Sequence, residues 1–490
     1  MNCIELFNQE VVRGSSAYVL SILLRHIEPI LREAADLGSW QIISRNQALG
    51  QLEIADLSTI QDKVFKKPTV ILTDNLKGEE EVPDGVVAVI TPAQVDILSH
   101  VSVRSRNAKI LFATCYEAKI IDELKSYQGQ GIKLTVNASG DVEYQLDKSG
   151  VAKEENIKEM KMPAVSCRRV SFARYAVASK DFTSKLVGGK SLLLLQLKNK
   201  IPAWVRIPRS VAIPFCVCER VLAMKENKAL LQGYNKLEQV IDQNPLQNLL
   251  KLRECINELI PPPDLPKSLK HAMADEGMPW PDDWMTLWSR IKHVWASKWN
   301  ERAYWSRKKW RMSHDKLHMA VLIQEVVDAQ FAFVIHTANP FTNDKNELYG
   351  EIVLGLGETI CSGNYPGRAL SFTCRKVKKN LKPSIISYPG KSLALKGSGL
   401  IIRSDSNGED LEGYAGAGLY DSVLLAPPLE KLPDYIDSPL LWQEDFRKKF
   451  LQDITKLGIE TENAMDGFPQ DIEGAYADGK FYIVQTRPQV

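Results

Sequence analysis

A histidine in a basic helical segment is the first candidate for chemistry in this 490-residue chain. His100 lies in residues 98–106, which read LSHVSVRSR and follow a strand-like apolar run at 85–90 and a Thr-Pro break. This order predicts an imidazole near a helix N-terminus, where unpaired amides and the helix dipole favour a negative group. Neutral imidazole is a good nucleophile near pH 7, so His100 is a candidate carrier of a phosphoryl group.

Two arginines follow this histidine within about one or two helical turns. Arg104 and Arg106 are candidates to pair with the oxygens of a phosphoryl group on His100. A structural histidine beside a strand is the alternative that these nine residues alone leave open.

A second set of residues is typical of a polyphosphate site. Residues 186–191 read LVGGKS before an apolar helical run, and such a turn offers amides and the Lys190 ammonium to phosphate. An ordinary helix start is the alternative, because the first glycine of a Walker A loop is missing. Residues 400–410 read LIIRSDSNGED, which predicts a strand that ends near Arg403. The glycine-rich loop at 413–422 would let the backbone approach a ligand closely.

Two C-terminal segments carry oxygen ligands suited to a hard cation. Residues 470–474 read QDIEG and residues 482–488 read YIVQTRP, and an Asp-Gly-Lys turn separates them. A hairpin would place Glu473 and Gln485 on adjacent strands, where their oxygens could hold Mg²⁺ that bridges phosphates. Arg487 would add a second phosphate clamp. A hairpin with surface charges is the alternative for either strand alone.

Several α/β segments must position these residues. The pattern predicts an N-terminal mixed α/β segment at 1–66 with an amphipathic helix at 16–35, a compact α/β unit at 67–146, a charged linker at 147–172, and a larger α/β region at 173–490 with a helical insertion at about 217–310. The linker is either a tether that lets a phosphorylated domain move or a segment packed on the surface. The apolar runs at 319–327 and 331–335 are predicted to be strands of one central sheet.

Composition narrows the class of protein. The formal net charge is +2, 44% of the residues are hydrophobic and 25% are charged, as in an ordinary soluble protein. This balance gives no argument for a nucleic-acid partner or an anionic membrane. The eight cysteines are scattered, which favours a reducing compartment. No apolar run is long enough to span a membrane, and we expect no signal or transit peptide on this chain.

The motifs resemble a known family of phosphotransferases. The pattern Ser-His-x-x-x-Arg-x-Arg, followed by AKILFATC, resembles the phosphohistidine domain of the dikinase and phosphoenolpyruvate-synthase superfamily, most closely its alpha-glucan, water dikinase branch. The stretches at 294–303 (VWASKWNERA), 333–337 (FVIHT) and 403–423 resemble the ATP-grasp nucleotide-binding domain of the same enzymes. The resemblance spans essentially the whole chain and matches the C-terminal part of those enzymes.

The resemblance implies an α/β multidomain fold, in which a compact α/β phosphohistidine domain is followed by an ATP-grasp domain. It implies that His100 is the phosphorylated nucleophile and that Glu473 and Gln485 hold Mg²⁺. Gln324 and Glu325 would lie near the adenine. The full set of residues implied to bind ATP is Lys190, Gln324, Glu325, Arg403, Gly418, Ser422, Glu473, Gln485 and Arg487.

The resemblance also implies an activity. An alpha-glucan, water dikinase converts ATP, alpha-glucan and water into AMP, phosphoglucan and phosphate through a phosphohistidine, in starch metabolism. Its substrate partner is the alpha-glucan, and its location is the chloroplast, with the cytoplasm as the alternative. A non-catalytic ATP-binding or regulatory fragment without glucan-binding modules is the rival reading. A phosphoenolpyruvate-synthase-like dikinase is disfavoured, because no residues remain for a ketoacid barrel. The assembly is left open between a monomer and a homodimer.

Overall fold

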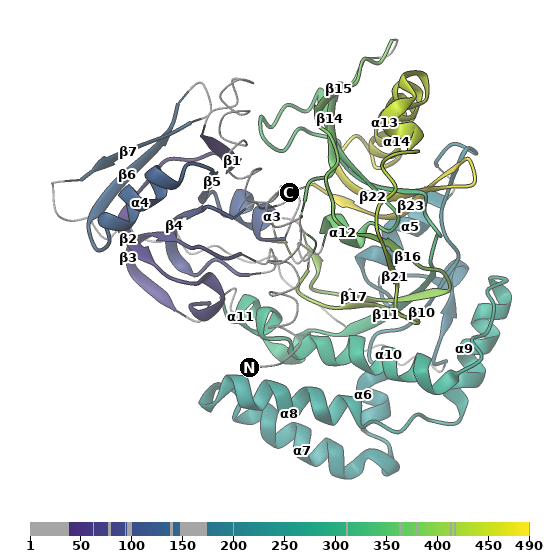
Figure 1. Cartoon of the computed structure of the whole chain (residues 1–490). Helices are drawn as coiled ribbons and strands as arrows, with labels where there is room; N and C mark the ends of the chain where they lie inside the picture. The colour runs from purple at the N-terminus through teal and green to yellow at the C-terminus, as the bar shows by residue number, and fades with distance from the viewer. Residues whose placement is uncertain are drawn as a thin grey trace, which may run out of the picture. The chain divides into compact units, whose positions relative to one another are not determined.

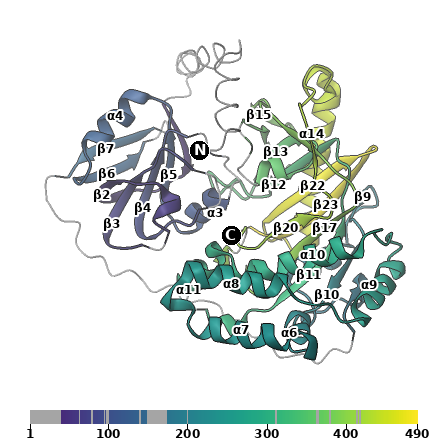
Figure 2. The same ribbon diagram turned by 60° about the horizontal axis from the view of Figure 1, so that its bottom comes forward.

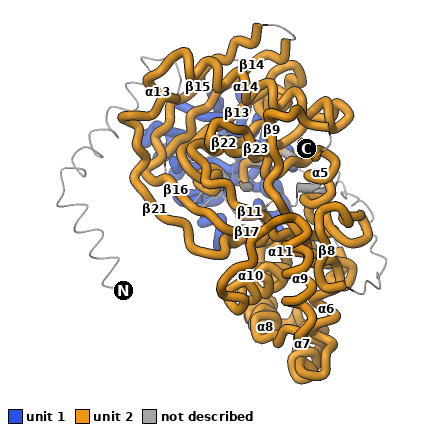
Figure 3. Tube along the Cα trace, turned by 90° about the vertical axis from the view of Figure 1, so that its right-hand side faces the viewer, with its two compact units in different colours: residues 1–76, 82–97, 108–157 blue, residues 77–81, 98–107, 158–490 orange. Residues whose placement is uncertain are grey.

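The computed structural model describes most of the chain from residue 39 onward, in two compact units. The gaps in this range are residues 62, 77–79, 94, 96–99, 138–140, 148–173, 199, 310–311, 362–364, 366, 378–379, 412–413, 416–417 and 490. The expected helix at 16–35 and nearly all of the expected linker at 147–172 therefore lie outside the described residues. Figure 3 colours the two units, and unit 2 includes residues 77–81 and 98–107 together with 158–490.

Unit 1 is built on one seven-stranded sheet with the order β1-β5-β4-β3-β2-β6-β7. Its strands are β1 (Trp40–Ser44), β2 (Ala48–Ile54), β3 (Val64–Leu72), β4 (Asp84–Thr91), β5 (Leu111–Cys115), β6 (Gly131–Val136) and β7 (Val142–Leu146). Strands β2 to β5 pair in parallel. Strand β5 is buried at every position, as expected for a parallel strand covered on both faces. The amphipathic helix α4 (Ala118–Ser126) buries Ile121 and Leu124.

The sheet of unit 1 starts before the expected boundary at residue 66. Strand β2 pairs with β3, with Leu52 opposite Val70, so strands on both sides of the boundary share one sheet. The division into segments 1–66 and 67–146 is therefore corrected, since residues from Trp40 onward build the same sheet. The change in composition near residue 68 reports local patterning, which does not reveal which strands pair.

Unit 2 contains two larger sheets. The five-stranded sheet has the order β20-β17-β11-β10-β8, and the seven-stranded sheet has the order β15-β14-β13-β12-β22-β23-β9. The strands of the first are β8 (Val177–Ala178), β10 (Ser210–Ile213), β11 (Met319–Glu325), β17 (Leu400–Ser406) and β20 (Ser422–Leu424). The strands of the second are β9 (Val205–Arg206), β12 (Phe331–His336), β13 (Glu347–Leu354), β14 (Leu370–Arg375), β15 (Ser384–Ser387), β22 (Gln470–Ala477) and β23 (Lys480–Pro488). Short pairs are formed by β16 (Ala394–Lys396) with β21 (Leu429–Lys431) and by β18 (Asp410–Leu411) with β19 (Tyr414–Ala415).

The two apolar runs expected in one central sheet lie in different sheets. Strand β11 pairs with β10 and β17, whereas β12 pairs with β13 and β22. The segment that connects β11 to β12 is hydrogen-bonded to both sheets. The Val326 amide donates to the carbonyl oxygen of Gly399, just before β17, and the Gln330 amide donates to that of Tyr476 in β22. Apolar periodicity predicted both strands but could not identify their partners.

The described part of unit 2 also contains α-helices. They are α3 (His100–Asn107), α5 (Gly189–Lys198), α6 (Val217–Leu222), α7 (Lys228–Gln239), α8 (Pro245–Asn257), α9 (Asp264–Asp275), α10 (Trp284–Ala296), α11 (Glu301–Lys309), α12 (Glu358–Cys361), α13 (Pro439–Trp442) and α14 (Glu444–Ala464). Figures 1 and 2 show α10 beside β11 and β17, with α7 and α8 beyond it. Trp288, Trp295 and Trp299 are buried in this helical layer and belong to its hydrophobic core. Within the described residues, no helix has the length and apolar character needed to cross a membrane.

The hairpin of β22 and β23 keeps the register of its two-residue turn as far as Gly474 and Ile483, where a β-bulge shifts the pairing by one residue. Asp478 and Gly479 separate the strands and have φ angles of 50° and 72°, as a two-residue type I′ turn requires. The turn alone would set Glu473 opposite Val484, and the bulge instead sets Glu473 opposite Gln485 and Asp471 opposite Arg487. The expected adjacency of Glu473 and Gln485 is therefore confirmed.

Candidate functional site

One cavity of about 360 Å³ in unit 2 is lined by residues from both sheets. Strands β11, β17 and β20 supply one group of these residues, and β12, β22 and β23 supply the other. All nine residues expected to bind ATP are among them: Lys190, Gln324, Glu325, Arg403, Gly418, Ser422, Glu473, Gln485 and Arg487. Residues spread over about 300 positions of sequence thus meet at one place.

The N-terminus of helix α5 is occupied by a carboxylate of the protein. Asp405 accepts hydrogen bonds from the amides of Gly188 (2.9 Å) and Lys190 (3.0 Å), and from the Ser191 hydroxyl (2.5 Å). A Cβ at Gly188 would lie 2.6 Å from the Asp405 carbonyl oxygen, so only glycine permits this approach. The expectation that these amides cradle phosphate is corrected, because Asp405 already satisfies them.

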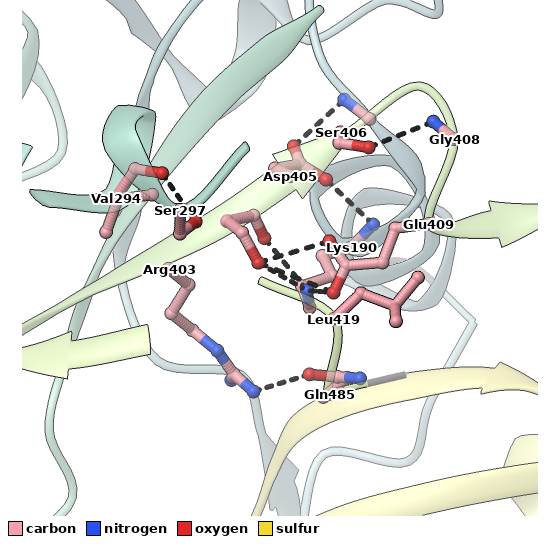
Figure 4. A network of polar contacts seen from close by, with 12 residues as sticks. Lys190, Val294, Ser297, Arg403, Asp405, Ser406, Gly408, Glu409, Leu419 and Gln485 are labelled. Carbon is pink, nitrogen blue, oxygen red and sulfur yellow. Dashed lines mark hydrogen bonds and ion pairs between the residues drawn. The ribbon is translucent and has the colours of Figure 1, made fainter. Parts of the chain in front are cut away.

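The ammonium of Lys190 lies in a buried polar network with the strand β17 and the loop after it (Figure 4). Its Nζ donates to the carbonyl oxygen of Ser404 at 2.9 Å and to the Ser404 hydroxyl at 3.2 Å. It also forms an ion pair with Glu409, and both side chains are less than one-tenth exposed. The network fixes the lysine at the wall of the cavity, while the carboxylate offsets its charge.

Arg403 connects the two sheets across the cavity. From strand β17, its Nη2 donates to Gln485 (Figure 4). The same nitrogen donates to Glu473 Oε2 at 3.2 Å, and both acceptors lie on the hairpin of the other sheet. Its Nη1 donates to Gln324 Oε1 and to the Val484 carbonyl oxygen, each at 3.2 Å. The buried Nε has no hydrogen-bond partner among the residues that the structure describes. Arg403 therefore has one donor left to offer a ligand.

Arg487 is the third expected cation, and it is paired with the neighbouring strand. Its Nε and Nη2 donate to Asp471 Oδ2 at 2.9 Å and 2.6 Å. Burial alone would raise the pKa of Asp471, but the charge of Arg487 holds that pKa below its ordinary value. His336 lies beside this pair, with Nε2 3.5 Å from Asp471 Oδ1, and burial lowers its pKa to about 4. The imidazole is therefore neutral at pH 7.

Arg302 and Asp421 line the cavity but were not among the residues predicted from the sequence. Arg302 Nη2 donates to Asp421 Oδ1 at 2.6 Å, and its Nε donates to the Leu419 carbonyl oxygen at 3.2 Å. Asn300 donates to the same carboxylate, and His293 Nε2 lies 3.1 Å from it. Burial would raise the pKa of Asp421, yet the His293 hydrogen bond and the charge of Arg302 keep it low. The location of Arg302 in the family-like stretch at 294–303 was the available signal.

Two expected adenine neighbours have different surroundings. Gln324 is buried, and its Nε2 donates to the Val484 carbonyl oxygen at 3.3 Å. Glu325 instead forms an ion pair with Arg209, whose Nε donates to Oε2 at 2.7 Å. The Glu325 carboxylate is thus engaged by a residue that does not line the cavity.

Two further expected residues lie in the loop and strand after β17. Gly418 has a φ angle of 69°, a left-handed conformation that suits glycine. Ser422 opens β20 and pairs with Arg403 in the sheet. The loop therefore brings both residues to the same wall as the arginine.

The described part of helix α3 runs from His100 to Asn107, and the four residues before it are not described, so the expected place of His100 at a helix N-terminus stays a prediction. The His100 side chain lies outside the described part of the structure. Arg104 is buried and forms an ion pair with Glu81 (2.9 Å). Burial lowers the pKa of Arg106 to about 10, although Tyr349, Asp471 and Glu351 oppose that shift. The expected pairing of these arginines with phosphate stays a prediction.

Comparison with known protein families identifies the parts of the chain. Residues 39–153 match the phosphohistidine-like domain of alpha-glucan water dikinase, and residues 283–372 match the AMP/ATP-binding domain of pyruvate phosphate dikinase. The chain therefore combines the two domain types of a dikinase that uses a phosphohistidine.

The whole chain is a relative of the alpha-glucan water dikinases. It is 46% identical over 500 residues to alpha-glucan water dikinase 1, chloroplastic, of Arabidopsis thaliana, covering 100% of this chain and 35% of that protein. It is 44% identical to the chloroplastic alpha-glucan water dikinase of Solanum tuberosum, covering 99% of this chain and 34% of that protein. The phosphoenolpyruvate synthase of Pyrococcus furiosus is 30% identical over 202 residues, which is 41% of this chain and 21% of that protein. The chain thus spans about a third of the length of the dikinases it matches.

Proposed function

We propose that the chain carries the phosphohistidine and nucleotide-binding functions of an alpha-glucan, water dikinase. In this reaction ATP, alpha-glucan and water give AMP, phosphoglucan and phosphate. The observation that supports the proposal most directly is the convergence of nine family-implied residues on one cavity. The similarity over the whole chain favours this reading over a non-catalytic fragment.

The proposed steps conserve the three phosphoryl groups of ATP. A ring nitrogen of His100 attacks the β-phosphorus as the bond to the α-phosphate oxygen breaks, so AMP leaves. The γ-phosphoryl group passes to water and is released as phosphate. The phosphoryl group on His100 then passes to a glucosyl hydroxyl, which loses its proton. Lys190, Arg403 and Arg487 position the polyphosphate and offset its charge.

The side-chain oxygens of Glu473 and Gln485 fit a magnesium ion. Both accept from the same nitrogen of Arg403, so the two oxygens already converge on one point. The Glu473 side chain is about one-quarter exposed, which leaves it accessible from the cavity. When bound, Mg²⁺ would neutralise charge on the phosphates.

The substrate and the location follow from the relatives. Their names specify alpha-glucan as the acceptor, and two of them are named chloroplastic. We therefore infer that this chain acts on the alpha-glucan of starch in the chloroplast.

Labelled ATP tests the proposal. The chain is incubated with Mg²⁺ and either β-labelled or γ-labelled ATP, and the denatured protein is analysed with and without acid treatment. Retention of an acid-labile β label alone is expected, because a phosphohistidine is acid-labile. His100→Ala should abolish this label and still bind ATP, while His271→Ala, an exposed histidine on α9, should label normally. Labelling of His100→Ala, or no label on the wild type although ATP binds, would contradict the proposal.

A further inference from the structure

Three metal-binding side chains meet on unit 2 outside the nucleotide cavity. They are Cys216, Glu219 and His318, and their ligand atoms all lie within 4.8 Å of one another. Cys216 and Glu219 follow strand β10, whereas His318 immediately precedes β11. The antiparallel pairing of β10 and β11 sets Ile213 opposite Val321, and this register brings the three residues to one end of the strand pair.

The contacts within the cluster converge on one ring nitrogen. His318 Nδ1 lies 3.7 Å from Cys216 Sγ and 2.9 Å from Glu219 Oε1. Around a tetrahedral zinc, bond lengths of about 2.3 Å to sulfur and about 2.0 Å to nitrogen and oxygen separate sulfur from nitrogen by about 3.5 Å and nitrogen from oxygen by about 3.3 Å. The observed sulfur–nitrogen distance of 3.7 Å is close to this geometry. A small rotation of the exposed Glu219 side chain would lengthen the nitrogen–oxygen distance from 2.9 Å to about 3.3 Å.

The same geometry argues against a nucleophilic triad. In a Cys-His-acid triad, the thiol and the carboxylate contact opposite nitrogens of the imidazole, so that one proton can pass across the ring. Here both contact Nδ1. That nitrogen carries at most one proton, which cannot serve a thiolate and a carboxylate equally well. A cation at the point of convergence serves all three groups.

The backbone holds two of the three side chains in place. Cys216 has a φ angle of 65°, a left-handed conformation that non-glycine residues adopt rarely and at a cost in strain. The His318 amide donates to Asn407 Oδ1 at 2.9 Å, and the Asn407 amide donates to the His318 carbonyl oxygen at 3.3 Å. The backbone of His318 is therefore anchored to the residue that follows strand β17.

We propose that Cys216, Glu219 and His318 bind a zinc ion, with water at the fourth position. Thiolate, imidazole and carboxylate are ligands that zinc accepts together. The Glu219 side chain is 44% exposed, which gives the ion and its water a path from solvent. The ion would brace the segment after β10 against the start of β11. His318 is also hydrogen-bonded to Asn407, in the loop that carries Glu409, the partner of Lys190. The proposal is independent of the dikinase reaction.

Metal titration of the reduced, chelator-treated chain tests the site. One equivalent of Zn²⁺ is expected to bind, measured by competition with a chromophoric chelator. Co²⁺ in its place should give the near-ultraviolet absorption of a thiolate–cobalt bond. Cys216→Ser and His318→Asn should each weaken zinc binding at least about tenfold. The matched controls Cys255→Ser and His271→Asn, which change a half-buried cysteine and an exposed histidine elsewhere, should bind as the wild type does.

A third variant separates loss of the site from loss of the fold. Cys216→Gly removes the ligand and relaxes the left-handed backbone, so it should fold at least as well as the wild type and still lose zinc. Wild-type zinc affinity in Cys216→Gly, or no thiolate–cobalt band in the wild type, would overturn the proposal. Equal loss of zinc in Cys255→Ser would also overturn it.

Discussion

Lys190 and Glu409 form a buried ion pair although 219 positions separate them in the chain. The pair joins the first turn of helix α5 to the loop after strand β17, and Ser404 and Asp405 add hydrogen bonds between α5 and the strand itself. Lys190, at the wall of the nucleotide cavity, therefore also connects two segments that are distant in sequence.

Replacement of Lys190 by methionine should destabilise the fold as well as weaken ATP binding. The variant leaves the Glu409 carboxylate buried without its cation, which costs about 3–5 kcal/mol of unfolding free energy. Urea unfolding measures this change, and calorimetry measures ATP affinity. The double variant Lys190→Met, Glu409→Gln should recover part of the stability. Lys198→Met, at a side chain about half exposed, serves as the control. A Lys190→Met variant as stable as the wild type would show that the pair contributes nothing.

Asp405 should contribute more unfolding free energy than the capping residue of an exposed helix N-terminus does. Asp405→Ala removes the acceptor of the Gly188 and Lys190 amides and of the Ser191 hydroxyl, all buried. We expect a loss of about 2–3 kcal/mol in unfolding free energy. Asp283→Ala, at the exposed cap of α10, should cost about 1 kcal/mol in the same urea experiment. Equal losses in the two variants would refute the special role of Asp405.

Arg403→Lys should weaken ATP binding without unfolding the protein. The ammonium keeps the charge but cannot reach Gln324, Glu473 and Gln485 at once, as the guanidinium does. We expect the Kd for ATP to rise at least about tenfold, or 1.4 kcal/mol, in a calorimetric titration. Arg375→Lys, at an arginine that is largely exposed, should leave the Kd unchanged. An unchanged Kd in Arg403→Lys would remove this arginine from the proposed ATP site.

One buried histidine, His336, and one half-buried histidine, His314, predict a loss of stability in acid. Burial lowers the pKa of His336 and that of His314 to about 4, from 6.5 in the unfolded chain. The unfolded state therefore binds more protons between these values, so stability is complete above about pH 6.5 and falls as the pH drops toward about 4. Urea unfolding from pH 7.5 to 4.5 measures the slope.

The change of unfolding free energy with pH should depend on these two histidines. His314→Gln should flatten it, whereas His271→Gln, at an exposed histidine, should not. Stability that stays constant between pH 6.5 and 4.5 in the wild type would contradict the assignment of both groups.

Local sequence patterns predicted the strands and the turn of the site better than they predicted the contacts between distant segments. The two-residue Asp-Gly turn that joins β22 and β23 is a local signal, but the bulge that moves Glu473 from opposite Val484 to opposite Gln485 is not. The cap of α5 by Asp405 joins positions more than 200 residues apart, and no local pattern encodes it. The same limit explains why strands β11 and β12 were expected in one sheet.

Family resemblance supplied what periodicity could not. It collected nine residues from distant segments, and all of them line the cavity. It left out Arg302 and Asp421, because the sequence shows one as part of a basic helix and the other as part of a loop. Their pairing depends on the packing of α11 against the loop before β20, which only the folded structure reveals.

The pairing of every cation in the cavity has a consequence for how a nucleotide enters. Lys190, Arg302 and Arg403 each hold a carboxylate of the cavity, and Arg487 holds that of Asp471. An arriving triphosphate therefore exchanges with anions already present, so attraction from solvent is weak and binding should vary little with ionic strength. The carboxylates it displaces then need a positive partner. A nucleotide that arrives with its own divalent ion brings that partner, and the site discriminates against bare ATP.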